Sequence, residues 1–80
     1  MQADELFRQV VEVFQEVLDI DDLVLSIETT ADQVDGWDSL AHVRIVIAIE
    51  QAFGIRFETA EISGLLNVGD LIALIEHKLA

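Results

Sequence analysis

Three residues near the middle of the chain, Asp38, Ser39 and His42, have the side-chain types of a nucleophilic triad. A hydrolase serine normally lies in a turn of the form Gly-x-Ser-x-Gly, whereas the second residue after Ser39 is Ala41. Asp38 is also placed to cap a helix with its carboxylate, which would engage it with backbone amides. We therefore interpret Ser39 as a hydroxyl that another enzyme modifies, and we expect that the chain is not itself an enzyme.

Acidic residues in the first half of the chain suggest a calcium loop, but their spacing does not fit one. Asp19, Asp21 and Asp22 are clustered, yet the sixth position counted from Asp19 is Val24, where an EF-hand needs glycine. The chain also has no cysteine and only two histidines, which are far apart in the sequence. We expect no metal site.

The composition is that of an acidic protein with a packed core. Sixteen acidic residues oppose four basic ones, the net charge is −12, and 52% of the residues are hydrophobic. Residues 19–38 contain seven acids and no base. Nucleic acid is excluded as a partner because phosphate binding needs a basic face. Such acidity favours steering towards basic docking patches on larger partner proteins, although it can also serve solubility alone.

The length and the hydropathy define the class of protein expected. Eighty residues suffice for one domain, which we assign to residues 1–80. No apolar run approaches the length of a membrane span, and the first residues do not resemble a signal peptide. We therefore predict a monomeric, cytoplasmic protein that does not insert into membranes.

Helical periodicity predicts an all-α fold. Apolar residues recur at helical spacing in residues 6–18, 40–53 and 71–79, and each of these segments is predicted to be a helix. Asp38 and Asn67 are the predicted N-caps of the second and last of them. These caps place Ser39 at the start of a helix, where free backbone amides and the helix dipole tolerate an added negative charge.

Two further segments complete the expected fold. Thr59 is predicted to cap a short third helix that runs from Ala60 to about Leu65. Residues 19–38 lose the helical period and are predicted to form a long ordered loop. Apolar side chains within this loop are expected to hold it to the core: Leu23, Leu25, Ile27 and Val34.

An ordered series of short motifs resembles the acyl carrier protein family. The series covers nearly the whole chain: Asp38-Ser39-Leu40, Val43, Ile45-Val46, Ile49-Glu50, Phe53-Gly54-Ile55, Phe57, Glu61-Ile62 and Asn67-Val68-Gly69-Asp70-Leu71-Ile72. The resemblance implies a four-helix bundle with a long first loop. It also implies that a phosphopantetheinyl transferase uses coenzyme A to attach 4'-phosphopantetheine to Ser39. The thiol of that group would hold an acyl group as a thioester, which the carrier shuttles between acyl-loading and acyl-transfer or synthase enzymes.

The resemblance also suggests roles for other residues. Asp38 would help the transferase to hold its metal and to orient the Ser39 hydroxyl. One set of residues on the second helix is predicted to contact partner enzymes: Leu40, Arg44, Ile47 and Glu50. A position at the edge of the core is the alternative for Leu40 and Ile47. A second set would line an acyl-chain sleeve, although a tightly packed core fits it equally well: Val43, Val46, Ile62 and Leu71.

The second helix departs from the pattern of carriers in primary fatty acid synthesis, which resemble one another in a strongly acidic second helix. This chain has Ala41, His42 and Arg44 where acids would be expected. The departure favours a specialised lipid, polyketide or secondary-metabolite pathway. A peptidyl or aminoacyl carrier with the same cofactor is one alternative, and an unmodified interaction module that kept the fold is another.

Overall fold

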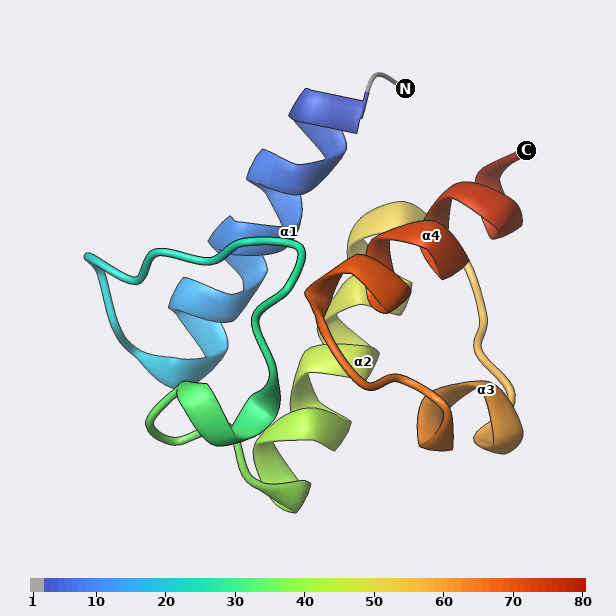
Figure 1. Cartoon of the computed structure of the whole chain (residues 1–80). Coiled ribbons are helices and arrows are strands. Elements are labelled where there is room, and N and C mark those ends of the chain that lie inside the picture. The colour runs from blue at the N-terminus through green and yellow to red at the C-terminus, as the bar shows by residue number, and fades with distance from the viewer. Residues whose placement is uncertain (1–2) are drawn as a thin grey trace.

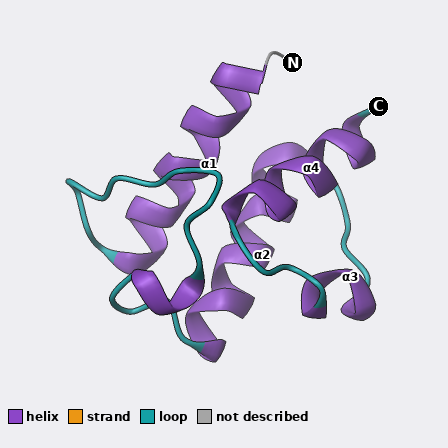
Figure 2. Ribbon diagram, viewed as in Figure 1, coloured by secondary structure: helices purple, strands orange, loops and turns teal. Residues whose placement is uncertain are grey.

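The computed structural model describes residues 3–80, and every regular element in that range is a helix (Figure 1, Figure 2). The elements are α1 (Ala3–Leu18), a 3-10 turn η1 (Ala31–Gln33), α2 (Ser39–Phe53), α3 (Thr59–Ser63) and α4 (Val68–Leu79). None of these helices is both long and apolar enough to cross a membrane. The prediction of an all-α bundle with a long first loop and a short third helix is confirmed.

The core forms where α1 packs against α2 and α4. Leu6, Val10 and Phe14 of α1 are spaced four residues apart, so they lie on one face of the helix, and all three are buried. The other two long helices contribute the remaining helical core residues: Ala41, Ile45, Val46 and Ile49 from α2, and Val68, Leu71, Ile72 and Ile75 from α4.

Local sequence determines where α2 and α4 begin and where α2 ends. Oδ1 of Asp38 accepts a hydrogen bond from the N–H of Ala41 at 2.8 Å, and Oδ1 of Asn67 accepts one from the N–H of Asp70, also at 2.8 Å. Both predicted N-caps are therefore confirmed. Gly54 ends α2 with φ +66°, a left-handed conformation that favours glycine because a Cβ is disfavoured there.

The start and the end of α3 differ from the prediction. The helix begins at Thr59 with Glu58 as its N-cap and ends at Ser63, so the predicted Thr59 cap and the extension to Leu65 are wrong. Oε1 of Glu61 accepts a hydrogen bond from the N–H of Glu58 at 2.8 Å, which closes the first turn one residue earlier than expected. Nζ of Lys78 in α4 lies 2.8 Å from the same Oε1 and joins the two helices. Two hydrogen bonds lower the pKa of Glu61: the one from Lys78 has the larger effect, and the one from the N–H of Glu58 has the smaller effect.

The first loop packs against the core largely as expected. Leu25 and Val34 are buried, and Leu23 packs against the core from a partly buried position. Ile27 is the exception, because its side chain is 59% exposed. The prediction that this side chain holds the loop to the core is therefore wrong.

The backbone of the loop makes the contact that the Ile27 side chain does not make. The Ile27 carbonyl accepts a hydrogen bond from the N–H of Gly69 at 2.8 Å, and the Thr29 carbonyl accepts one from the N–H of Val68 at 2.9 Å. These two amides belong to the first turn of α4 and have no partner within their own helix. A Cβ on Gly69 would lie 2.8 Å from the Ile27 carbonyl oxygen, so this close approach requires glycine.

Candidate functional site

Ser39 is the first residue of α2, and its side chain is exposed. Two amides near the start of α2 are satisfied by Asp38: its Oδ1 accepts from the N–H of Ala41, and its carbonyl accepts from the N–H of His42, both at 2.8 Å. Within residues 3–80, the N–H groups of Ser39 and Leu40 meet no acceptor. Free amides at the positive end of a helix stabilise an anion, so a phosphate ester on Ser39 fits this position.

Trp37 anchors the segment that leads into Ser39. Its side chain is only 8% exposed, and its ring meets Phe14 of α1 edge to face, with centroids 4.8 Å apart and an interplanar angle of 87°. On the other side the indole stacks on His42, and its Nε1–H donates a hydrogen bond to His42 Nδ1 at 3.1 Å. The backbone just before Ser39 is therefore held between α1 and α2.

The contacts of His42 and Asp38 differ from those of a nucleophilic triad. His42 Nδ1 accepts from Trp37, so neutral His42 carries its proton on Nε2. Asp38 directs its Oδ1 to the N–H of Ala41, and in the described part of the chain no hydrogen bond links Asp38, Ser39 and His42 through their side chains. A triad depends on both the serine–histidine and the histidine–aspartate bond. Neither of these bonds is present within residues 3–80.

A pocket of about 550 Å³ opens beside Ser39. Its walls come from η1, the start of α2, the end of α3 and the loop before α4: Ala31, Asp32, Trp37, Asp38, Ser39, His42, Ile62, Ser63, Leu65 and Leu66. The sequence analysis did not identify Leu65 and Leu66 as part of the site. The only signal in the sequence was a pair of apolar residues just before the Asn67 cap, where a polar loop is more usual.

Comparisons with known proteins agree with this site. The family model for the phosphopantetheine attachment site matches residues 8–75. The acyl carrier protein of Streptococcus pyogenes serotype M3 is 41% identical over 73 residues, which cover 91% of this chain and 95% of that protein. The acyl carrier protein of Thermotoga maritima is 32% identical over 76 residues, which cover 95% of this chain and 94% of that protein. The chain belongs to the acyl carrier protein family.

A solved structure extends this agreement to the fold. The solution structure of the holo acyl carrier protein from Geobacter metallireducens superposes with a TM-score of 0.85 at 38% identity, and covers 91% of this chain and 84% of that one. The resemblance noted in the sequence is confirmed. Membership of the family makes the chain a carrier protein that contains a phosphopantetheine attachment site, and not an enzyme.

The four residues predicted to line an acyl-chain sleeve lie in three different environments. Ile62 is a wall of the pocket that Ser39 also lines. Val46 and Leu71 are buried in the core, and Val43 is 51% exposed on the surface of α2. The carrier thus has an open space next to Ser39 and a packed core behind it.

The four residues predicted to contact partner enzymes also lie in two different environments. Leu40 is 69% exposed and Ile47 is 47% exposed, and Arg44 is exposed between them, so these three lie on the surface of α2 and not at the edge of the core. Glu50 is partly buried, and its Oε2 accepts a hydrogen bond from the N–H of Phe57 at 2.8 Å. This carboxylate stabilises the turn that follows α2.

Proposed function

We propose that the chain carries an acyl group as a thioester on 4'-phosphopantetheine attached to Ser39 and passes it between enzymes. The observation that carries the proposal is the position of Ser39, exposed at the start of α2 beside two unpaired amides and a pocket of about 550 Å³. Ser39 lies within the span matched by the family model for the phosphopantetheine attachment site. The bound group would supply the thiol that this cysteine-free chain lacks.

Attachment requires the Ser39 oxygen to act as a nucleophile inside a transferase. The oxygen would attack the β-phosphorus of coenzyme A, adenosine 3',5'-bisphosphate would leave, and the hydroxyl proton would pass to a base of the transferase. Of the two carboxylate oxygens of Asp38, only Oδ1 accepts a hydrogen bond within residues 3–80. Oδ2 is therefore left for the metal of the transferase. The free N–H groups of Ser39 and Leu40 would then hold the phosphodiester that results.

The pocket beside Ser39 is the first space that an attached group would meet. Ile62 lies on its wall, so we assign Ile62 to the entrance of the proposed sleeve. Val46 and Leu71 lie deeper, and an acyl chain would reach them only if the core opened between the helices. Val43 is 51% exposed on the outer side of α2 and does not line this pocket, so we leave it out of the proposed sleeve.

We propose that the carrier serves a specialised lipid, polyketide or secondary-metabolite pathway. Glu50 is the only acid in α2, and its carboxylate is bound to the N–H of Phe57. A peptidyl or aminoacyl carrier would use the same cofactor and is distinguished by the enzyme that loads it. The acids of the first loop, such as exposed Asp21 and Asp22, suit partners with basic docking patches, and we expect the carrier to act as a cytoplasmic monomer.

The decisive test is the intact mass of the protein after incubation with coenzyme A and a broad-specificity phosphopantetheinyl transferase. We expect a gain of one phosphopantetheinyl group, lost in Ser39→Ala and retained in Ser63→Ala, which removes another hydroxyl from the wall of the same pocket. No gain for the wild-type chain, under conditions that load a control carrier, would instead support an unmodified interaction module.

A further inference from the structure

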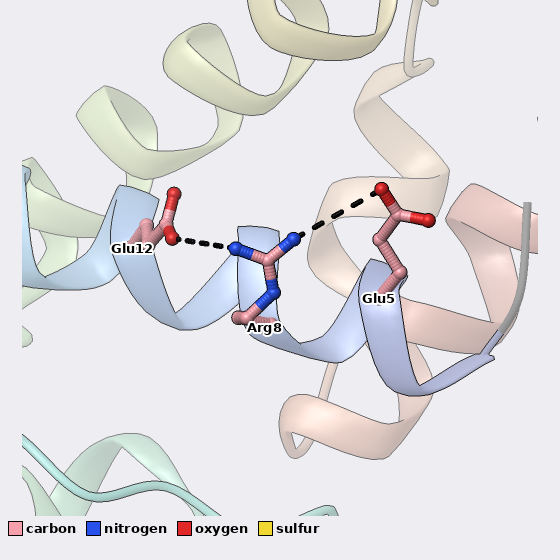
Figure 3. Close-up of polar contacts among 3 residues, drawn as sticks. All are labelled: Glu5, Arg8 and Glu12. Carbon is pink, nitrogen blue, oxygen red and sulfur yellow. Dashed lines mark hydrogen bonds and ion pairs between the residues drawn. The ribbon is translucent and has the colours of Figure 1, made fainter.

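The four basic side chains have two kinds of surroundings. The Arg8 guanidinium lies between Glu5 and Glu12 on the surface of α1, at 3.9 and 3.3 Å (Figure 3). Lys78 is paired with Glu61 at 2.8 Å. Arg44 and Arg56, in contrast, form no ion pair with any carboxylate of residues 3–80, although the chain contains sixteen acids.

Both unpaired cations border one surface, which we call the α2 strip. It consists of Leu40, Val43, Arg44, Ile47 and Gln51 of α2, followed by Arg56. Leu40, Arg44, Ile47 and Gln51 are three or four residues apart and Val43 lies beside Arg44, so the set forms one stripe about 16 Å long that starts next to Ser39. At its far end Ile47, Gln51 and Arg56 line a common recess of about 550 Å³, whose walls also include Glu50.

The strip is an apolar and positive surface on a protein of net charge −12. Leu40, Val43 and Ile47 are all roughly half exposed or more, which is unusual for three large apolar side chains in one row. The one carboxylate of α2, that of Glu50, is bound to the N–H of Phe57 and does not neutralise Arg44. Arg44 and Arg56 therefore have no carboxylate partner within residues 3–80, and a second protein can supply one.

Contact between this helix and partner enzymes is what the family resemblance implies; we propose that, for this chain, the partner's face opposite the α2 strip is apolar and carries carboxylates that meet Arg44 and Arg56. The inference rests on the proposed function, because enzymes that act on a group at Ser39 must approach this end of α2. A basic docking face would place like charges against Arg44 and would be disfavoured there. Partners are thus attracted by the acids elsewhere in the chain but selected at α2 by the opposite chemistry.

A charge-swap experiment on the loading reaction tests this proposal. The probes are a phosphopantetheinyl transferase with a basic carrier-binding face and its variant in which one lysine that faces α2 is replaced by glutamate. We expect Arg44→Glu to raise kcat/KM about threefold with the basic enzyme and to lower it by a similar factor with the glutamate variant, as a single exposed ion pair allows. Leu40→Ala should lower kcat/KM at least fivefold with both enzymes because it removes apolar contact area.

Arg8→Glu is the control for net charge, because it changes the charge by the same amount at a residue of α1 that is not part of the strip. It should alter kcat/KM less than twofold with either enzyme. Equal effects of Arg44→Glu and Arg8→Glu would overturn the proposal, since only long-range charge would then matter. Failure of the wild-type chain to load at Ser39 would contradict the proposed function itself, whereas Ser39-dependent loading that ignores the strip would contradict only this inference.

Discussion

The two longest helices of this carrier, α1 and α2, both bury an apolar inner face, but their outer faces differ in chemistry. Each buries its apolar residues in the same core, with Phe14 on α1 and Ile49 on α2 fully enclosed. The outer face of α1 is charged, and its Arg8 is held by two glutamates. The outer face of α2 is apolar, and its Arg44 is unpaired within residues 3–80. Since exposed apolar side chains in one stripe are typical of a surface that contacts another molecule, the comparison agrees with the proposal that α2 has a second interface.

The largest expected effect comes from an isoleucine-to-alanine substitution, made once on each of the two faces of α2. Ile49→Ala should lower the free energy of unfolding by about 2–5 kcal/mol, because Ile49 is fully buried and its truncation leaves a cavity. Ile47→Ala should change it by less than about 0.5 kcal/mol, because Ile47 is on the surface. Denaturant unfolding measures both values. A comparable loss in the two variants would mean that the outer face of α2 supports the core and is not reserved for a partner.

A smaller effect is expected at the end of α2 that carries Ser39. Asp38→Ala removes the side-chain acceptor of the Ala41 N–H and should cost about 1 kcal/mol of unfolding free energy. Asp38→Asn keeps an acceptor oxygen and should recover most of that loss. Asp35→Ala, a nearby exposed acid, serves as the control in thermal unfolding. If Asp35→Ala and Asp38→Ala were equally destabilising, general charge in the loop would explain the result better than capping.

The contributions of paired and unpaired basic side chains to stability can be compared by how each contribution changes with pH. The pKa of Glu61 is lowered below its ordinary value of 4.5, first by the hydrogen bond from Lys78. A lowered folded pKa stabilises the protein above the unfolded pKa, and this stabilisation disappears as the pH falls through the folded value. Lys78→Gln should therefore lower the melting temperature at pH 7 and lose most of this effect in acid.

Arg56→Gln is the control for that titration, because Arg56 has no ion pair in the described part of the chain. Its melting temperature should follow that of the wild type at a constant offset from pH 7 downwards. A Lys78→Gln offset that did not shrink in acid would show that the α3–α4 contact does not depend on the charge of Glu61.

The smallest expected effects contrast the two arginines directly. Arg8→Ala should cost about 0.5 kcal/mol at low salt, because it removes two exposed pairs on α1, and this cost should fade at high salt. Arg44→Ala should change the unfolding free energy by no more than a few tenths of a kcal/mol at any salt concentration. A larger, salt-sensitive loss in Arg44→Ala would reveal an intramolecular partner and weaken the proposed role of the α2 strip.

Local sequence was sufficient to predict most of the fold and the position of Ser39 at the start of α2. The N-caps Asp38 and Asn67 and the stop at Gly54 depend on hydrogen bonds and dihedral angles within one turn, so the sequence specifies them. Apolar periodicity likewise identified the three long helices. The α3 cap was predicted one residue late because Thr59 was taken as the cap, whereas the N–H of Glu58 bonds Oε1 of Glu61 and closes the turn one residue earlier. The contact of Lys78 with the same oxygen joins residues that are distant in sequence, and it exists only in the fold.

By itself the sequence determined the three long helices, the caps Asp38 and Asn67, the acidic charge and the position of Ser39 at the start of α2, because each depends on residue types or on neighbours a few residues apart. Only the tertiary structure decided which apolar residues are buried, since burial depends on what packs against a side chain. It placed Val43 on the surface and Val46 in the core, and bound the first loop through the Ile27 carbonyl. It also enclosed Trp37 between Phe14 and His42 and opened the pocket beside Ser39, both of which require segments distant in sequence to meet.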